Sequence, residues 1–449
     1  MKKIKLPKDV DYIINTLNKE GYQANLVGGA VRDILMGKEP KDFDINTNAL
    51  PEEIIKIFPR TEPTGLKHGT VSVILNGIPY EITTYRIDGE YKNHRKPENV
   101  YFVNDLKEDL SRRDFTINAM AYNHSEGLID PFNGFGDLKN NILKTPKKPE
   151  EILNQDPLRI LRAYRFKAKY GLKFDEELQK ALRIKNPYLK FISAERIKSE
   201  LDKILMSDNP LVLRELLNYQ SDIMPEFSKT LGFNQKNPYH DFTLDYHILL
   251  SVKEVDKDLD LRWTMLFHDL GKIDTFEEID GIGHFYGHSK KSQKIAQNIM
   301  NRLKFSNKSF ERISVLVLEH DREIEVNDRA IKRLMRKLGE DISKDLIKIK
   351  KADILSQKIY RVSDYCPTPR LTKLAYIDKK IEKILSEKQC YTIKDLEING
   401  KDLIDLGYKE GKEIGIILRV LLEKVIENPL LNNRNTLVEL VNQTLYYKQ

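Results

Sequence analysis

Apolar positions recur with two different periods in the first third of the chain. Residues 8–19 carry apolar side chains at the three- and four-residue spacing of a helix. Residues 71–75 and 80–85 are short runs rich in β-branched and aromatic residues, and the Asn-Gly pair at 76–77 is a hairpin signal. Residues 1–145 are therefore predicted to mix strands with helices.

Strand signals mostly end at a proline boundary. The polar stretch 88–109 predicts a flexible loop, and Pro146 and Pro149 then flank a pair of lysines. From residue 150 onward the apolar positions follow helical spacing, beginning with residues 152–168. The predicted fold class is α+β, with a small mixed head followed by an all-α remainder.

Composition limits the class of protein further. The chain has 449 residues, 40% hydrophobic and 32% charged, which predicts several globular domains. Its net charge of +7 leans toward polyanionic partners. Cys366 and Cys390 have neither disulfide-framework nor metal-ligand spacing. No apolar stretch suits a signal peptide or a membrane span, so we expect a cytoplasmic protein without a membrane partner.

Two glycines follow an apolar, strand-like run, and two aspartates lie on a second predicted strand. A strand places residues two apart on one face, so Asp42 and Asp44 would project together, about 7 Å apart. Convergent carboxylates suit Mg²⁺, which can activate a hydroxyl nucleophile and neutralise a triphosphate. Gly28 and Gly29 would let backbone amides approach a phosphate. Each pair alone is usually a turn or a cap, but the combination is far more specific.

The combination resembles the signature of polymerase-β-like nucleotidyltransferases, and more narrowly of bacterial-type (class II) CCA-adding enzymes and poly(A) polymerases. The resemblance continues through residues 109–120. It implies catalytic, Mg²⁺-binding roles for Asp42 and Asp44, and leaves Glu81 as either a third metal-side carboxylate or a solvent-facing strand residue. It also implies a site for CTP and ATP. The residues of that site are Gly28, Gly29, Arg32, Arg112, Arg113, Asp114, Asn118, Asp156, Arg159, Arg162 and Arg165.

Guanidinium groups fit the chemistry that the resemblance implies. Arg112 and Arg113 could bind phosphate oxygens bidentately, although a surface ion-pair cluster is the ordinary alternative. Asp156 and Arg159 resemble a nucleotide-selecting motif that reads the edge of the base. Their spacing would place them on one face of a helix, where a plain salt bridge is the alternative. Gln155 stands where the family has glutamate, which removes a charged anchor for Arg159.

Histidines and aspartates form a second constellation, which resembles the HD phosphohydrolase superfamily. Imidazole and carboxylate ligands together suit Mn, Ni, Fe or Zn, and such a centre hydrolyses phosphate esters. The alternative is a degenerate HD scaffold without metal. Removal of 2′,3′-cyclic or terminal phosphates from RNA ends is one use. The six positions are His247, His268, Asp269, His288, His320 and Asp353.

Four parts are predicted along the chain. They are a nucleotidyltransferase head at 1–145, a helical neck with the selecting motif at 146–225, an HD domain at 226–375, and a tail at 376–449. The tail resembles the RNA-binding tail of CCA-adding enzymes, so tRNA is the expected partner.

The predicted function is template-independent transfer of CMP and AMP from CTP and ATP to the 3′ end of tRNA, with release of pyrophosphate. An A-adding enzyme or poly(A) polymerase would share the same motifs. Two rivals come from other classes, namely an HD phosphohydrolase acting on RNA ends or nucleotides, and a non-catalytic RNA-binding protein. The sequence leaves open the oligomeric state, the HD metal and its substrate.

Overall fold

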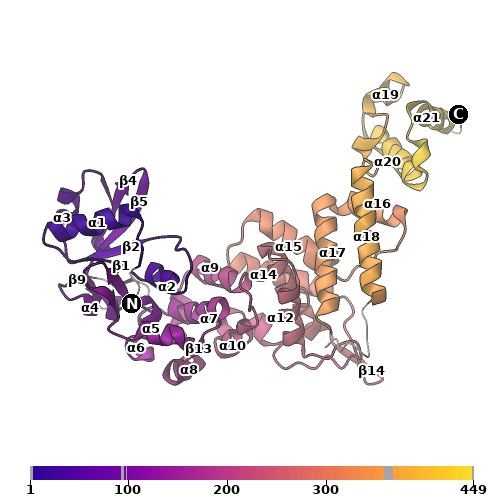
Figure 1. Ribbon diagram of the computed structural model, residues 1–449. Coiled ribbons are helices and arrows are strands. Elements are labelled where there is room, and N and C mark those ends of the chain that lie inside the picture. Colours follow the sequence, from indigo (N-terminus) through magenta and orange to yellow (C-terminus); the bar gives the residue numbers. More distant parts are fainter. Residues whose placement is uncertain (1–3, 90, 93–95, 98, 358–367, 447–449) are drawn as a thin grey trace. The chain divides into compact units, whose positions relative to one another are not determined.

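The computed structural model divides the chain into two compact units, Met1–Ser228 and Lys229–Gln449 (Figure 1). The first unit holds the main sheet and the second is mainly helical, which confirms the predicted α+β class. The finer division into four parts stays a prediction. The residues that the structure describes are 4–89, 91–92, 96–97, 99–357 and 368–446.

A mixed seven-stranded sheet forms the head of the first unit. Its spatial order is β11-β10-β1-β2-β5-β4-β3, and only the β2–β5 pair is parallel among these neighbours. The strands are β1 (Ala24–Val27), β2 (Asp44–Thr47), β3 (Thr61–Gly65), β4 (Thr70–Leu75), β5 (Ile78–Thr84), β10 (Ala121–Asn123) and β11 (Gly127–Ile129). The predicted hairpin is confirmed between β4 and β5, where Asn76 and Gly77 both have positive φ angles.

Apolar side chains from helices complete the core of the head. Helix α1 (Lys8–Lys19) has the predicted bounds and buries Val10, Ile13, Ile14 and Leu17. Helices α2 (Gly29–Leu35) and α3 (Pro51–Ile57) add Val31 and Ile54 to the same cluster. This packing supports the sheet in which the interior strand β2 begins at Asp44.

The polar stretch predicted as a flexible loop is partly regular. Strands β6 (Arg86–Asp88) and β9 (Val100–Phe102) pair, as do the two-residue strands β7 (Tyr91–Lys92) and β8 (Lys96–Pro97). Helix α4 (Leu106–Ser111) follows, and Asp105 caps it by accepting a hydrogen bond from the Lys107 amide. Residues 90, 93–95 and 98 of the predicted loop lie outside the described residues.

Helices continue the first unit after the head. A short parallel pair of strands, β12 (Ile142–Leu143) with β13 (Lys173–Phe174), connects the end of the head to these helices. The helical conformation is interrupted between α6 and α7, and the residues at this interruption form part of the candidate site. The helices are α5 (Gly134–Lys139), α6 (Pro149–Gln155), α7 (Leu158–Tyr170), α8 (Glu176–Arg183), α9 (Ala194–Leu205), α10 (Val212–Tyr219) and α11 (Pro225–Ser228).

The described part of the second unit consists of helices and one hairpin, β14 (Glu277–Ile279) with β15 (Ile282–His284), which the sequence pattern did not predict. Its helices are α12 (Leu244–Glu254), α13 (Leu259–Phe267), α14 (His288–Arg302), α15 (Asn307–Glu319), α16 (Asp328–Leu338), α17 (Glu340–Leu355), α18 (Thr368–Ser386), α19 (Gly400–Asp405), α20 (Lys412–Glu427) and α21 (Arg434–Tyr446). The last three share a small apolar core of their own. Among the described residues, no helix combines the length and apolar character needed to cross a membrane.

Candidate active site and a histidine–aspartate cluster

The two predicted catalytic aspartates lie at the start of strand β2, but they are not both on it. Asp44 is its first residue, whereas Asp42 precedes the strand, so the alternation argument does not apply to the pair. Their carboxylates are nevertheless close enough to interact. Removal of water by surrounding protein raises the pKa of Asp44, Arg113 opposes the rise, and the charge of Asp42 adds to it. Two carboxylates that repel one another this way are suited to share a cation.

A third carboxylate lies on the neighbouring strand. The register between β2 and β5 pairs Ile45 with Ile82, which makes Asp44 and Glu81 the preceding neighbours. Glu81 is exposed. Carboxylate oxygens are the donors that a hard divalent cation prefers, although these three do not form a group whose ligand atoms all lie within 4.8 Å of one another.

A glycine turn brings the chain from β1 into α2. Gly28 has a φ angle of 72°, and a Cβ atom there would lie 2.7 Å from Nη1 of Arg113. Only glycine avoids both the strained backbone and this contact. The Gly28 amide donates to the Met120 carbonyl, so the expectation that it points at a phosphate is wrong. Gly28 instead makes room for a guanidinium.

Asp109, which the sequence motif contained but to which no role was given, holds the two consecutive arginines. Its buried carboxylate accepts a bond of 2.8 Å from Nη2 of Arg112 and lies 3.8 Å from Nη2 of Arg113. It also accepts from Nδ2 of Asn46. Burial alone would raise the pKa of Asp109, but the two arginines lower it below its ordinary value. The three- and four-residue spacing was the available signal.

Asp114 organises a second set of side chains. One oxygen accepts from Asn118 Nδ2 at 2.9 Å, and the other accepts from Arg162 Nε at 2.8 Å. Asn118 in turn accepts from Arg32. Burial would raise the pKa of Asp114, yet Arg162 and Asn118 lower it to about 2. Because both oxygens are already used, Asp114 orients its neighbours and has little capacity left for a ligand.

The selecting motif lies at the break between α6 and α7, not on one helical face as predicted. Asp156 follows α6 in an extended conformation, and Arg159 is in the first turn of α7. Arg159 donates to the carbonyls of Ile152 and Arg112 and to Oε1 of Gln155, at 3.1, 2.8 and 3.2 Å. The neutral Gln155 therefore does help to fix this arginine.

Arg196, near the start of α9, completes this corner. Its Nη2 lies 3.0 Å from Oδ2 of Asp156, forty residues away along the chain. Its Nη1 is buried without a hydrogen-bond partner in the described structure. Arg165 nearby is held by Glu200 at 2.6 Å.

These groups line one pocket of about 460 Å³. All eleven residues predicted to bind the nucleotide contribute to it, together with Asp44, Leu158, Phe166 and Arg196. Seven arginines face three carboxylates, so the lining is strongly cationic. Such a pocket suits a compact polyanion placed beside the Asp44 carboxylate.

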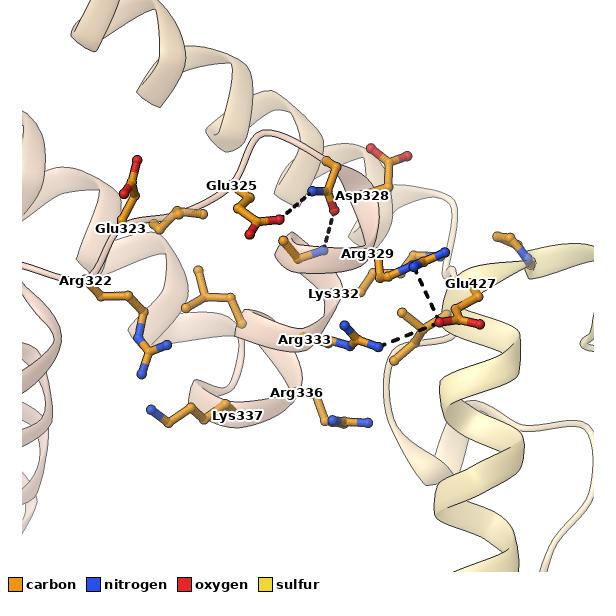
Figure 2. Close-up of a pocket in the computed structure, with 16 residues that line it drawn as sticks. Arg322, Glu323, Glu325, Asp328, Arg329, Lys332, Arg333, Arg336, Lys337 and Glu427 are labelled. Carbon is orange, nitrogen blue, oxygen red and sulfur yellow. Dashed lines mark hydrogen bonds and ion pairs between the residues drawn. The ribbon is translucent and has the colours of Figure 1, made fainter.

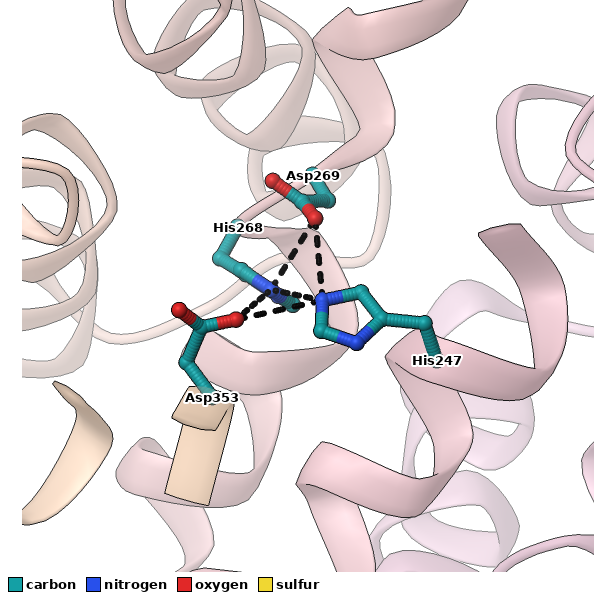
Figure 3. Close-up of side chains that lie close together, drawn as sticks. All are labelled: His247, His268, Asp269 and Asp353. Atoms are coloured by element: carbon teal, nitrogen blue, oxygen red, sulfur yellow. Dashed lines mark hydrogen bonds and ion pairs between the residues drawn. The ribbon is translucent and has the colours of Figure 1, made fainter. Parts of the chain in front are cut away.

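The six histidine and aspartate positions meet inside the second unit. Figure 3 shows four of them, His247, His268, Asp269 and Asp353. They form two groups that share Asp269, one with His247, His268 and Asp353 and the other with His288 and His320. Asp269 Oδ2 lies 3.1 Å from His247 Nε2 and 3.3 Å from His268 Nε2. Its Oδ1 lies 3.4 Å from His288 Nε2 and 3.6 Å from His320 Nε2.

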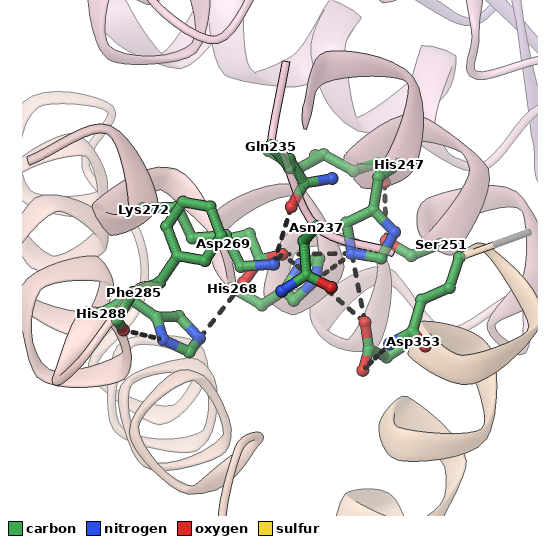
Figure 4. A network of polar contacts seen from close by, with 12 residues as sticks. Gln235, Asn237, His247, Ser251, His268, Asp269, Lys272, Phe285, His288 and Asp353 are labelled. Carbon is green, nitrogen blue, oxygen red and sulfur yellow. Dashed lines mark hydrogen bonds and ion pairs between the residues drawn. The ribbon is translucent and has the colours of Figure 1, made fainter. Parts of the chain in front are cut away.

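The buried charges of this cluster balance one another. Burial would lower the pKa of His268, but Asp269 and Asp353 raise it to about 10. Lys272 donates to Gln235 and approaches Asp269 Oδ2 at 2.7 Å (Figure 4). The sequence interpretation gave Lys272 no role. Convergent imidazoles and carboxylates of this kind fit first-row transition metals.

Another hollow of the second unit has a different character (Figure 2). It measures about 970 Å³ and lies between α16 and α20. Arg329 and Arg333 reach Glu427, while Arg333 and Arg336 reach Glu423. These ion pairs join α16 to α20, so we interpret the hollow as the place where the two helices pack together.

The first unit has the sheet, the carboxylate edge and the cationic pocket of a nucleotidyltransferase, and comparison with known proteins narrows that class. Residues 24–144 match the family model of the poly(A) polymerase head domain. Residues 171–230 match a model of the RNA and SrmB binding site of polymerase A, and residues 278–441 match domain 2 of tRNA nucleotidyltransferases.

Whole-chain relatives carry the comparison further. The CCA-adding enzyme of Anoxybacillus flavithermus is 31% identical over 93% of each chain, and that of Lactococcus lactis strain MG1363 is 31% identical over 99% of each. The crystal structure of the Bacillus stearothermophilus CCA-adding enzyme in complex with CTP aligns with a TM-score of 0.72 at 25% identity, covering 99% of each chain. This chain belongs to the family of CCA-adding enzymes.

Proposed function

We propose that this nucleotidyltransferase transfers CMP and AMP from CTP and ATP to the 3′ end of tRNA, releasing pyrophosphate in the cytoplasm. The arginine-lined pocket beside Asp44 is the observation that carries the proposal. Arg112 and Arg113 would hold the triphosphate, since Asp109 presents both guanidinium groups together. In-line phosphoryl transfer depends mainly on such positioning and charge neutralisation.

The residues at the sheet edge fit Mg²⁺. Asp42 and Asp44 would hold it, and Glu81 supplies a further oxygen donor from β5. Mg²⁺ bound there would favour deprotonation of the attacking 3′-hydroxyl and neutralise charge on the triphosphate.

Base choice would fall to the corner formed by Asp156, Arg159 and Arg196. A carboxylate accepts and a guanidinium donates, which together can match the Watson–Crick edge of a pyrimidine or a purine. The relative from B. stearothermophilus was crystallised in complex with CTP, which supports a nucleotide as a ligand of this fold. In our proposal Arg196 keeps Asp156 in place while Arg159 meets the base.

Incorporation of labelled CTP and ATP on tRNA transcripts tests the proposal. The transcripts should end before, within and after CCA, with wild type and Asp42→Ala/Asp44→Ala compared in Mg²⁺. We expect the wild type to add C, C and A and then stop, and the variant to be inactive. Addition of A alone would identify an A-adding or poly(A) enzyme, and no incorporation by the wild type would contradict the proposal.

A second candidate function is hydrolysis of phosphate esters at the histidine–aspartate cluster. The two ligand groups that share Asp269 favour it, because a bridging carboxylate suits a pair of Mn, Ni, Fe or Zn ions. Such ions would polarise a phosphate and activate water. Elemental analysis of the full chain, with p-nitrophenyl phosphate hydrolysis, tests this function. Equal metal content in wild type and Asp269→Ala would contradict it.

A further inference from the structure

Two hollows open beside the histidine–aspartate cluster, and they share one side chain. The first, of about 310 Å³, reaches the cluster itself through His320 and Asp353. The second, of about 430 Å³, is lined by Tyr239 and His240. Arg370, near the start of α18, lines both.

Arg370 is linked to the cluster through two hydrogen bonds. Its Nη1 donates to Oε1 of Gln357 at 2.7 Å, and Nε2 of Gln357 donates to Oδ2 of Asp353 at 3.2 Å. Among the described residues, Arg370 meets no carboxylate that would neutralise it. Its guanidinium therefore keeps its charge a short distance from the metal-ligand oxygens.

Other cations line the same wall. Lys350 lies one helical turn before Asp353 on α17, and it donates to the His320 carbonyl at 2.6 Å. Lys373 lies one turn after Arg370 on α18, but it pairs with Glu323 at 3.5 Å in the same hollow. Arg370 and Lys350 are therefore the basic side chains that two helices direct toward this opening and that remain for an anion. An arginine fork suits a phosphate better than a lysine does.

The second hollow adds an aromatic face. Tyr239 is 62% exposed, yet its backbone is fixed, because its amide donates to Oδ1 of Asn237 at 3.0 Å. Nδ2 of Asn237 in turn donates to the Gly283 carbonyl of β15. The neighbouring His240 packs its ring 5.0 Å from that of His247. An exposed ring on a fixed backbone is what a nucleobase needs for stacking.

We propose that Arg370 and Tyr239 select the substrate of the histidine–aspartate centre, Arg370 by binding a phosphate group and Tyr239 by stacking on a base. The substrate is then a phosphate ester of a nucleoside, either free or at an RNA end. This inference rests on the hydrolytic function proposed above, but binding tests it separately.

The first test is calorimetric titration of the Mn²⁺-treated full chain with inorganic phosphate. Arg370→Ala should weaken binding roughly 10–100-fold, because charged hydrogen bonds to the phosphate are lost, and Arg370→Lys should restore part of it. Lys379→Ala removes an exposed cation from the same helix and should bind as wild type does. Metal content should stay equal in all four proteins. Unchanged phosphate binding in Arg370→Ala, or loss of metal along with phosphate, would overturn the role of Arg370.

The second test compares esters with and without a base. Tyr239→Ala should raise KM roughly tenfold for a nucleoside 3′-phosphate and for a short RNA with a 3′-phosphate, but not for glycerol phosphate. An effect on only one base-containing ester would tell free nucleotide from RNA end. Equal effects on all three esters, or none, would overturn the role of Tyr239. A wild type that hydrolyses nothing would end the hydrolytic proposal, and weaker phosphate binding by Arg370→Ala would still support its anion site.

Discussion

The nucleotide pocket of the first unit and the histidine–aspartate cluster of the second solve opposite electrostatic problems. The pocket is open and carries an excess of arginines, each held by neighbours such as Asp109 and Asp114. The cluster is buried apart from the partly exposed Asp353, and its acidic and basic side chains lie against one another. A solvent-exposed site for a polyanion can keep an excess of positive charge, because water solvates it. Buried carboxylates that bind cations must be paired with positive groups even when no cation is bound.

The largest effects are expected when one aspartate in each site is replaced by alanine. Asp44→Ala should reduce CTP incorporation at least roughly a thousandfold, since groups that act on the transition state contribute that much. The same variant should leave the metal content of the histidine–aspartate cluster, measured on the full chain, unchanged. Asp269→Ala should do the reverse, because both ligand groups lose their shared member. Loss of CTP incorporation in a folded Asp269→Ala protein would show that the sites are not independent.

A smaller effect is expected from Gly28→Ala. Left-handed backbone costs about 1–2 kcal/mol for a residue with a side chain, and the new Cβ would also displace Arg113. We expect kcat/KM for CTP to fall roughly a hundredfold. Gly37→Ala is the matched control, since its φ angle is 70° and no atom lies within 4 Å of its Cβ position. Equal losses in both variants would assign the effect to backbone strain alone.

Asp114→Asn should lower the free energy of unfolding by about 2 kcal/mol at pH 7, because the pKa of Asp114 falls from 3.8 to about 2 on folding. A lowered carboxyl pKa stabilises the fold above the unfolded pKa, and this contribution is lost as pH falls from about 4 toward 2. Circular dichroism in denaturant from pH 7 to pH 2.5 should show the two proteins converging.

The control for that experiment is Asp222→Asn. Asp222 pairs with Lys185 at 2.8 Å, but both side chains are more than half exposed. An exposed pair contributes little, so this variant should stay within about 0.5 kcal/mol of wild type at every pH. A gap between Asp114→Asn and wild type that is as large at pH 2.5 as at pH 7 would contradict the linkage.

The smallest effect should come from Gln155→Glu. A carboxylate at this position would strengthen the contact with Arg159, but two carbonyl groups already fix that arginine. We expect kcat/KM for CTP and ATP to change less than about fivefold, the effect of one part-buried charged contact. A large change in the preference between the two nucleotides would show that Gln155 tunes selection.

Local signals in the sequence predicted much of the fold and of the pocket. The hairpin at residues 76–77 and the helix at 8–19 depend on turn chemistry and spacing within a few residues. The nucleotide residues lie in short motifs, so the structure needed only to bring those motifs together. Whether Asp42, Asp44 and Glu81 perform the catalytic role stays a prediction.

Interactions between distant segments could not be predicted. Asp109 meets Asn46, and Asp156 meets Arg196, across 63 and 40 residues respectively. Such hydrogen bonds depend on how helices and strands pack, and one sequence holds no local record of it. The same limit explains why Asp269 was predicted as one ligand among six and not as the residue shared by two groups.

The anchoring of Arg159 also bears on how this corner can change over generations. Two of its three acceptors are main-chain carbonyls, of Ile152 and Arg112, which no side-chain substitution removes. The backbone conformation therefore fixes the direction of the guanidinium, whatever side chains Ile152 and Arg112 are replaced by. The third acceptor, at position 155, can be glutamate or glutamine. A substitution there can therefore remove the charged partner while the Arg159 guanidinium keeps its orientation.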